Sequence, residues 1–160
     1  MDKVDISVVL PVFNELENLS PLLADLNESL TGTGKTFEII FIDDGSTDGS
    51  LEKLTELQGF DPNVLVIEFR RNFGQTAALA AGLRHSNGEV VITLDADRQN
   101  DPKDIPMLLN EIDKGMDLVC GWRHDRKDGL WLRLLPSRIA NRLISMTTDV
   151  KLNDYGCTLK

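Results

Sequence analysis

Short β-branched apolar runs alternate with longer stretches of helical periodicity along the 160-residue chain. The apolar runs predict five strands, at Ile6–Val12, Phe37–Asp43, Val64–Phe69, Val90–Leu94 and Leu118–Cys120. The longer stretches predict five helices, at about 16–30, 48–58, 75–86, 102–114 and 131–147. Because strand and helix alternate in this order, right-handed crossovers should join strands that lie parallel. The sequence therefore predicts an α/β domain with a mainly parallel sheet and helices on both of its faces.

Three of the predicted helices begin at residues that favour a helix start. Asp48 can cap the second helix, Gly74 directly precedes Gln75, and Pro102 suits the first position of the fourth helix. The first predicted helix carries leucines at helical spacing, which we interpret as core packing.

The composition limits the classes of protein that the chain can represent. Hydrophobic residues make up 41% and charged residues 27%, and no apolar run has the roughly 18 residues of a membrane-spanning helix. A net charge of −9 argues against nucleic acid as a partner. Two cysteines, Cys120 and Cys157, exclude a disulfide framework and an all-cysteine zinc site. Since the charged N-terminus predicts no signal peptide, a reducing, cytoplasmic setting is expected.

All five predicted strands lead into polar loops. The loops read Pro11-Val12-Phe13-Asn14-Glu15, Asp43-Asp44-Gly45-Ser46, Arg70-Arg71-Asn72-Phe73-Gly74, Asp95-Ala96-Asp97 and Gly121-Trp122-Arg123. In sheets of this kind, ligands bind at the carboxyl ends of the strands. We therefore expect a functional site among these loops.

Asp95 and Asp97 are candidates for a metal site. Residues two apart on an extended segment point the same way, so the two carboxylates can converge on one cation. Such oxygen ligands suit magnesium or manganese, which proteins commonly share with substrate phosphates. The alternative is a solvated loop whose aspartate caps the next helix. The position directly after the apolar run Val90–Leu94 favours the metal site.

Asp43 and Asp44 form a second acidic strand end. Turn formation and helix capping by Ser46 or Asp48 explain part of this segment without any function. Two adjacent carboxylates also need hydrogen-bond donors or a metal, and ribose hydroxyls and base N–H groups are such donors. Two nucleotide-binding sequences, Gly-x-Gly-x-x-Gly and the P-loop, do not occur, which argues against a dinucleotide oxidoreductase or a P-loop ATPase. Phosphate would then be neutralised by a metal on the later aspartates.

The C-terminal quarter has a different charge balance from the rest. Residues 121–160 carry 8 basic and 4 acidic side chains, whereas residues 1–120 carry 9 and 22. Arg133 and Ser137 lie four apart on one predicted helical face, and Arg123 follows the preceding predicted strand. Two guanidinium groups and a hydroxyl can clamp a phosphate. A solvated basic face is the alternative, and the neighbouring Trp131 and leucines suggest a helix at a membrane surface.

Together these loops resemble the family 2 glycosyltransferases, and most closely the branch that transfers sugars to polyprenyl phosphates. Four motifs carry the family resemblance, in this order: Pro11–Glu15, Asp43–Gly49, Leu94–Gln99 and Gly121–Arg123. Two further motifs, Arg70–Gln75 and Asp154–Lys160, resemble the polyprenyl-phosphate branch specifically. The match covers essentially the whole chain. It implies a GT-A fold, which binds nucleotide sugars.

The resemblance also implies a set of donor-binding residues. Pro11, Phe13 and Glu15 match the positions that hold the nucleotide base, and Asp43 or Asp44 the position that meets base or ribose. The implied metal ligands are Asp95, which also meets the nucleotide, Asp97 as the principal ligand, and Gln99 as a third contact. Arg98 departs from the apolar residue expected inside this motif, which could alter the contacts to the nucleotide phosphates.

The implied acceptor-binding residues lie later in the chain. Arg123, Arg133 and Ser137 match positions that grip the lipid phosphate, and Asp154 is a candidate for positioning the acceptor or the sugar. Relatives continue beyond the position of Lys160 with amphipathic and usually membrane-spanning helices. Residues 1–160 are therefore expected to be one GT-A catalytic domain that is truncated at its C-terminus.

The resulting prediction is an inverting transferase that depends on Mg²⁺ or Mn²⁺. It would move a sugar from a UDP- or GDP-linked donor to a polyprenyl phosphate at the cytoplasmic face of a membrane. An ionised phosphate acceptor is already a nucleophile, so no strong general base is needed. Two alternatives stay open: a family 2 enzyme with a sugar-hydroxyl acceptor, and a non-catalytic nucleotide-sugar-binding module. A sugar nucleotidyltransferase is disfavoured because no glycine-rich loop follows the first strand. Whether the chain forms a homo-oligomer is open.

Overall fold

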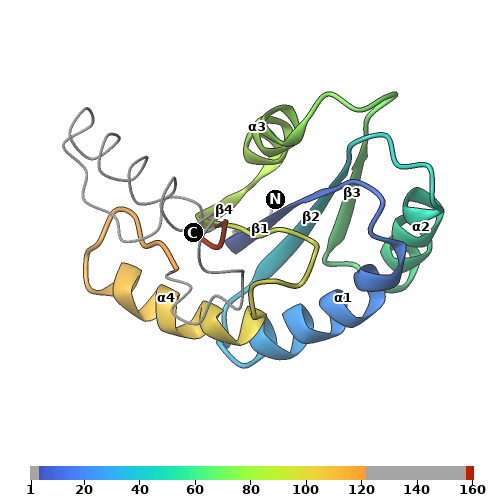
Figure 1. The fold of residues 1–160 in the computed structure, drawn as a ribbon. Coiled ribbons are helices and arrows are strands. Elements are labelled where there is room, and N and C mark those ends of the chain that lie inside the picture. Colours follow the sequence, from blue (N-terminus) through green and yellow to red (C-terminus); the bar gives the residue numbers. More distant parts are fainter. Residues whose placement is uncertain (1–3, 122–157) are drawn as a thin grey trace, which may run out of the picture.

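Four parallel strands form one sheet in the order β3-β2-β1-β4, in a computed structural model that describes residues 4–121 and 158–160 (Figure 1). The strands are β1 (Val4–Val12), β2 (Phe37–Asp43), β3 (Val64–Glu68) and β4 (Gly88–Thr93). The helices are α1 (Leu16–Thr31), α2 (Ser50–Phe60), α3 (Gln75–His85), the 3₁₀ turn η1 (Pro102–Asp104) and α4 (Ile105–Asp113). β1 pairs in parallel with β2 and β4, and β2 pairs in parallel with β1 and β3, so β1 and β2 are the two inner strands.

The central strands are covered on both faces, which explains their unbroken apolar sequences. Successive side chains of β1 enter different cores, because strand residues alternate between faces. Val8 and Leu10 belong to the larger core with α1, α2 and α4, whereas Val9 packs in the smaller core with Ala78 of α3. Figure 1 shows α3 on one side of the sheet and α1 and α4 on the other. The predicted parallel sheet with helices on both faces is confirmed.

Several predicted element boundaries differ from those in the structure. Leu118–Cys120 is not a strand, and Leu118 is 59% exposed. Lys160 instead takes the edge of β4, where it and Thr93 exchange two backbone hydrogen bonds of 2.9 and 3.2 Å. α2 begins at Ser50 rather than at Asp48, because Gly49 between them has a left-handed φ of 96°, which a right-handed helix does not contain. The helix predicted at 102–114 begins as the 3₁₀ turn η1, and the one predicted at 131–147 lies outside the described residues.

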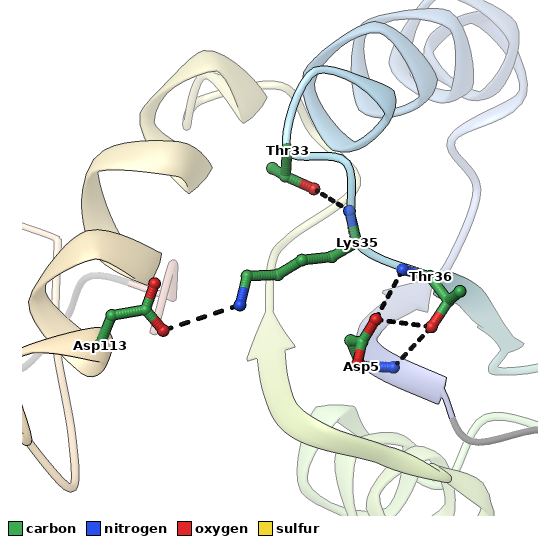
Figure 2. Close-up of polar contacts among 5 residues, drawn as sticks. All are labelled: Asp5, Thr33, Lys35, Thr36 and Asp113. Atoms are coloured by element: carbon green, nitrogen blue, oxygen red, sulfur yellow. Dashed lines mark hydrogen bonds and ion pairs between the residues drawn. The ribbon is translucent and has the colours of Figure 1, made fainter.

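A small polar cluster lies at the amino end of the sheet (Figure 2). The Asp5 carboxylate at the start of β1 accepts hydrogen bonds from the backbone N–H and the hydroxyl of Thr36, at 2.8 and 2.7 Å. Lys35 Nζ lies 3.7 Å from Asp113 Oδ1 at the end of α4. These contacts fix how β1 and β2 start relative to each other. Because they involve loops at the amino ends of the strands, they lie away from the expected ligand site.

Within the described part of the chain, none of the helices is long and apolar enough to cross a membrane.

α3 approaches the sheet closely at Gly82, which is buried. A Cβ placed there would clash with Val9 Cγ1 and lie 2.8 Å from Ile42 Cδ1. Because interiors are close-packed, an added methyl group must push α3 away from the sheet. Gly82 therefore sets the distance between α3 and the strands β1 and β2.

We predict that Gly82→Ala lowers the free energy of unfolding by about 1–3 kcal/mol, the usual cost of overpacking. Gly59→Ala is the matched control, because Gly59 lies in α2 with open space where a Cβ would go. Its gain in helix propensity should raise stability by up to about 1 kcal/mol. Urea unfolding of both variants measures the difference. Equal stabilisation by the two substitutions would show that α3 does not pack against the sheet as described.

Candidate functional site

A cavity of about 270 Å³ lies at the carboxyl ends of the strands. The strand order places it where the connections change direction, between β1 and β4, which is where open α/β sheets bind ligands. Its lining comes from the end of β1, the loops after all four strands and the start of α3: Pro11, Val12, Phe13, Glu15, Asp44, Asn72, Gly74, Gln75, Asp95, Ala96 and Asp97. The structure thus brings together most of the predicted donor-binding residues. Asp43 and Gln99 are not in this lining.

The loop after β1 is joined to the loop after β2 by hydrogen bonds. Asn14 has a positive φ of 58°, and its backbone N–H donates to Ser46 Oγ at 3.0 Å. In return, Asn14 Oδ1 accepts from the Thr47 N–H at 2.8 Å. The Glu15 N–H donates to the buried Ser50 hydroxyl at 2.9 Å. The segment that carries Phe13 and Glu15 is therefore held in shape before any ligand binds.

Asp48 completes this junction between loops. Its Oδ2 accepts from the Leu16 N–H at 3.1 Å, and its Oδ1 accepts from the N–H and hydroxyl of Ser50 at 3.0 and 2.6 Å. Desolvation disfavours the carboxylate, but the hydrogen bonds from Ser50 and Leu16 outweigh it, so the pKa of Asp48 is lowered from its ordinary value. The predicted capping role of Asp48 thus extends to two elements, the start of α2 and the start of α1.

Asp43 and Asp44 have separate roles although they are adjacent, and both are buried, at 1% and 3% exposure. Asp43 Oδ2 accepts from the N–H groups of Gly45 and Ser46, both at 3.1 Å, which is the turn chemistry predicted as an alternative. Asp43 Oδ1 is buried and has no hydrogen-bond partner among the described residues. Asp44 lines the cavity, and whether either carboxylate contacts a base or ribose remains a prediction.

The Asp44 carboxylate holds the loop after β3. Its two oxygens accept from the N–H groups of Phe73 at 2.7 Å and Gly74 at 2.8 Å. The loops approach so closely that a Cβ at Gly45, where φ is +73°, would lie 2.6 Å from the Arg71 carbonyl carbon. Only glycine fits this backbone.

An aromatic and cationic group supports the same loop from outside the cavity. The rings of Phe69 and Phe73 meet edge to face with centroids 5.5 Å apart, and the Arg71 guanidinium lies 4.9 Å from the Phe73 centroid. The sequence predicted this segment at a strand end and matched it to the motif Arg70–Gln75, but it assigned no individual role to Asn72, Gly74 or Gln75, which line the cavity.

The loop after β4 presents Asp95 and Asp97 to the cavity. Gln75 Nε2 donates to Asp95 Oδ1 at 2.8 Å, and the Gln99 N–H donates to Asp97 Oδ1 at 3.0 Å. Arg98 has a positive φ of 59°, and its guanidinium pairs with Asp25 of α1 at 3.0 Å. Gln99 and Arg98 line a neighbouring polar hollow rather than the cavity. The unexpected Arg98 is thus turned toward α1.

The carboxylates of Asp95 and Asp97 suit a metal ion that binds together with a ligand. Among residues 4–121 and 158–160, no group of three or more His, Cys, Asp or Glu side chains could hold a metal by itself. Asp95 and Asp97 nevertheless line one cavity and supply hard oxygen donors. Magnesium-like ions commonly bind one or two carboxylates and complete their shell with substrate phosphates and water. The donor set therefore suits a cation bound together with a diphosphate.

The predicted acceptor residues Arg123, Arg133, Ser137 and Asp154 lie outside the described part of the chain.

The protein family described as Glycosyl transferase family 2 matches residues 7–158, nearly the whole chain. The chain belongs to glycosyltransferase family 2. Dodecaprenyl-phosphate galacturonate synthase of Rhizobium johnstonii is 44% identical over 100% of the chain. Undecaprenyl-phosphate 4-deoxy-4-formamido-L-arabinose transferase of Edwardsiella ictaluri is 45% identical over 97% of it. These matches confirm the resemblance to the polyprenyl-phosphate branch, although the chain spans only 48% of the length of each relative.

Solved structures confirm the GT-A fold expected for a family 2 member. The mannosyltransferase PcManGT from Pyrobaculum calidifontis, in complex with GDP-Man and Mn²⁺, superposes with a TM-score of 0.55 at 28% identity. That match covers 62% of this chain and 29% of PcManGT. S. aureus TarS 1–349, in complex with UDP-GlcNAc, has a TM-score of 0.59 at 24% identity, covering 69% and 32% of the two chains.

The lowered pKa of Asp48 predicts how acid affects this family 2 domain. A carboxyl whose pKa is depressed by folding stabilises the native state above its unfolded pKa, and this contribution is lost as pH falls through the folded value. In urea unfolding, wild type should therefore lose stability below about pH 4 more steeply than Asp48→Asn. Ser50→Ala, which removes one donor to Asp48, should flatten the profile in part. Coincident profiles for Asp48→Asn and wild type would contradict the assigned contacts.

Proposed function

We propose that the chain is the donor-binding part of an inverting, metal-dependent glycosyltransferase. It transfers a sugar from a UDP- or GDP-linked donor to a polyprenyl phosphate at the cytoplasmic face of a membrane. The observation that carries the proposal is the pair Asp95 and Asp97 in one cavity with the loops after β1 and β2. Family membership and two relatives named for polyprenyl-phosphate substrates support the transfer and the acceptor. Mn²⁺ and GDP-Man in the PcManGT structure support the metal and the donor class.

In this proposal the two ends of the cavity bind different parts of the donor. Pro11, Phe13 and Glu15 hold the base at one end, together with Asp44 at the end of β2. Carboxylates accept N–H groups from a base, which favours uracil or guanine. Asp95 and Asp97 hold the divalent cation at the other end, with Gln99 as a further ligand if the loop rearranges. Bound there, Mg²⁺ or Mn²⁺ neutralises charge on the departing diphosphate.

The acceptor phosphate needs orientation rather than deprotonation. An ionised phosphate oxygen attacks the anomeric carbon directly, and the bond to the diphosphate breaks on the opposite face, so the configuration inverts. Arg123, Arg133 and Ser137 grip the acceptor phosphate, and Asp154 positions the acceptor or the sugar. Guanidinium groups suit this task because they bind phosphate oxygens in pairs. The lipid acceptor places the site beside a membrane surface.

The proposal predicts that Arg133→Ala, in the full-length protein, impairs sugar transfer to a short polyprenyl phosphate. Nucleotide binding in the presence of Mg²⁺ or Mn²⁺ should stay close to wild type, because other loops hold the donor. Arg133→Lys should recover only part of the transfer, since an ammonium group lacks the guanidinium fork. A panel of UDP- and GDP-linked sugars assayed with each metal measures transfer and donor choice together.

Three results would overturn parts of the assignment. If folded Arg133→Ala transfers sugar to the lipid phosphate at the wild-type rate, Arg133 does not bind the acceptor. If wild type glycosylates a sugar hydroxyl instead of the lipid phosphate, the enzyme has the alternative acceptor. If wild type binds the donor but neither transfers nor hydrolyses it with metal, the chain is a binding module. Thermal unfolding of each variant controls for loss of fold.

A further inference from the structure

We propose that Gln75 is a positioning residue of this cavity: its side-chain amide orients the Asp95 carboxylate toward the metal-bound diphosphate. The inference rests on the proposed function, because it assigns a role within the same donor site. It concerns a residue at the end of the motif Arg70–Gln75 to which the sequence assigned no role, and which lies on a different element from Asp95.

The geometry joins α3 directly to the end of β4. Gln75 is the first residue of α3, and its Nε2 donates to Asp95 Oδ1 at 2.8 Å. Both residues line the cavity. A hydrogen bond to a charged acceptor is stronger than one between neutral groups. By fixing Oδ1, Gln75 sets the rotation of the carboxylate and therefore the direction of its second oxygen.

The backbone before Gln75 is held in a shape that lets the Gln75 side chain extend to Asp95. Gly74, directly before it, has φ +91°, a conformation that side-chain-bearing residues rarely adopt. The Asp44 carboxylate holds the N–H groups of Phe73 and Gly74. The start of α3 is therefore tied to the end of β2, while the Gln75 side chain extends to the end of β4. Three strand ends are thus connected through one short segment.

The chemistry of glutamine suits this role. Its amide offers an N–H donor without a charge, so it orients the carboxylate without competing with a cation for the site. A lysine would bring a positive charge to the place where the metal is needed. Gln75 is also exposed, so its side chain contributes little to core packing. Replacing it should therefore change the site and leave the fold intact.

The test compares Gln75→Met, which keeps the length of the side chain and removes the donor, with Thr76→Val. Thr76 is an exposed neighbour in the first turn of α3 that does not line the cavity. Mn²⁺ binding is measured from the electron paramagnetic resonance signal of free Mn²⁺, with saturating UDP or GDP, whichever binds wild type. Gln75→Met should weaken Mn²⁺ binding about 10-fold, as expected for loss of a hydrogen bond that orients a ligand.

Two further readouts separate positioning from a structural role. Metal-free UDP or GDP binding and the thermal midpoint should stay near wild type for Gln75→Met, with affinity within about twofold. Gln75→His, which restores an N–H donor, should recover part of the Mn²⁺ affinity. Thr76→Val should match wild type in every measurement.

The outcomes distinguish this inference from the proposed function. If wild type binds UDP or GDP more tightly with Mn²⁺ but Gln75→Met binds Mn²⁺ equally well, the role of Gln75 is overturned and the donor site stands. If Gln75→Met loses metal-free binding and thermal stability together, Gln75 is structural and the inference again fails. If wild type itself shows no metal-dependent binding, both the metal site and the inference fall.

Discussion

β1 pairs in parallel with β2 on one side and β4 on the other, so three carboxyl ends meet at one edge of the sheet. The location of the candidate site follows from this pairing. It places Pro11–Glu15 between the acidic ends of β2 and β4, and it leaves room there because the connections diverge to opposite faces. The buried residues of β1 and β2 keep the register, and Gly82 lets α3 pack closely against Val9 and Ile42 of these strands. The order and pairing of the strands therefore determine where the site lies, before its side chains are considered.

The acidic side chains at this edge of the sheet have two different roles. Asp43, Asp44 and Asp48 accept backbone N–H groups from Gly45, Ser46, Phe73, Gly74, Leu16 and Ser50, and so hold the loops in place. Asp95 and Asp97 line the cavity at the end of β4, and Asp44 lines it as well as holding a loop. Acidic side chains at this edge disfavour a bound diphosphate unless a cation compensates its charge, which supports the proposed metal.

The sequence allowed the layered fold and the carboxyl-end location of the site to be predicted, because periodicity and strand-end loops are local signals. Asp95, Asp97 and the Pro11–Glu15 loop entered the cavity as expected. The different roles of Asp43 and Asp44 could not be predicted, because they depend on the loop 70–74 after β3, which contacts Asp44. The motif Arg70–Gln75 included Gln75, but its contact with Asp95 could not be predicted because the two residues lie on different elements. Leu118–Cys120 was wrong because three apolar residues do not specify a strand when another segment, here Lys160, takes the neighbouring edge.

The central claim is that a divalent cation binds at Asp95 and Asp97 only together with a nucleoside diphosphate. Paramagnetic broadening of backbone amide signals by Mn²⁺ tests it most directly. With UDP or GDP present, substoichiometric Mn²⁺ should broaden the signals of residues 95–97 and 74–75 first. Omitting the nucleotide, or substituting Asp97→Asn, should remove most of that selective effect. Broadening that centres elsewhere, such as around Asp5 and Asp113, or that is unchanged in Asp97→Asn, would contradict the account.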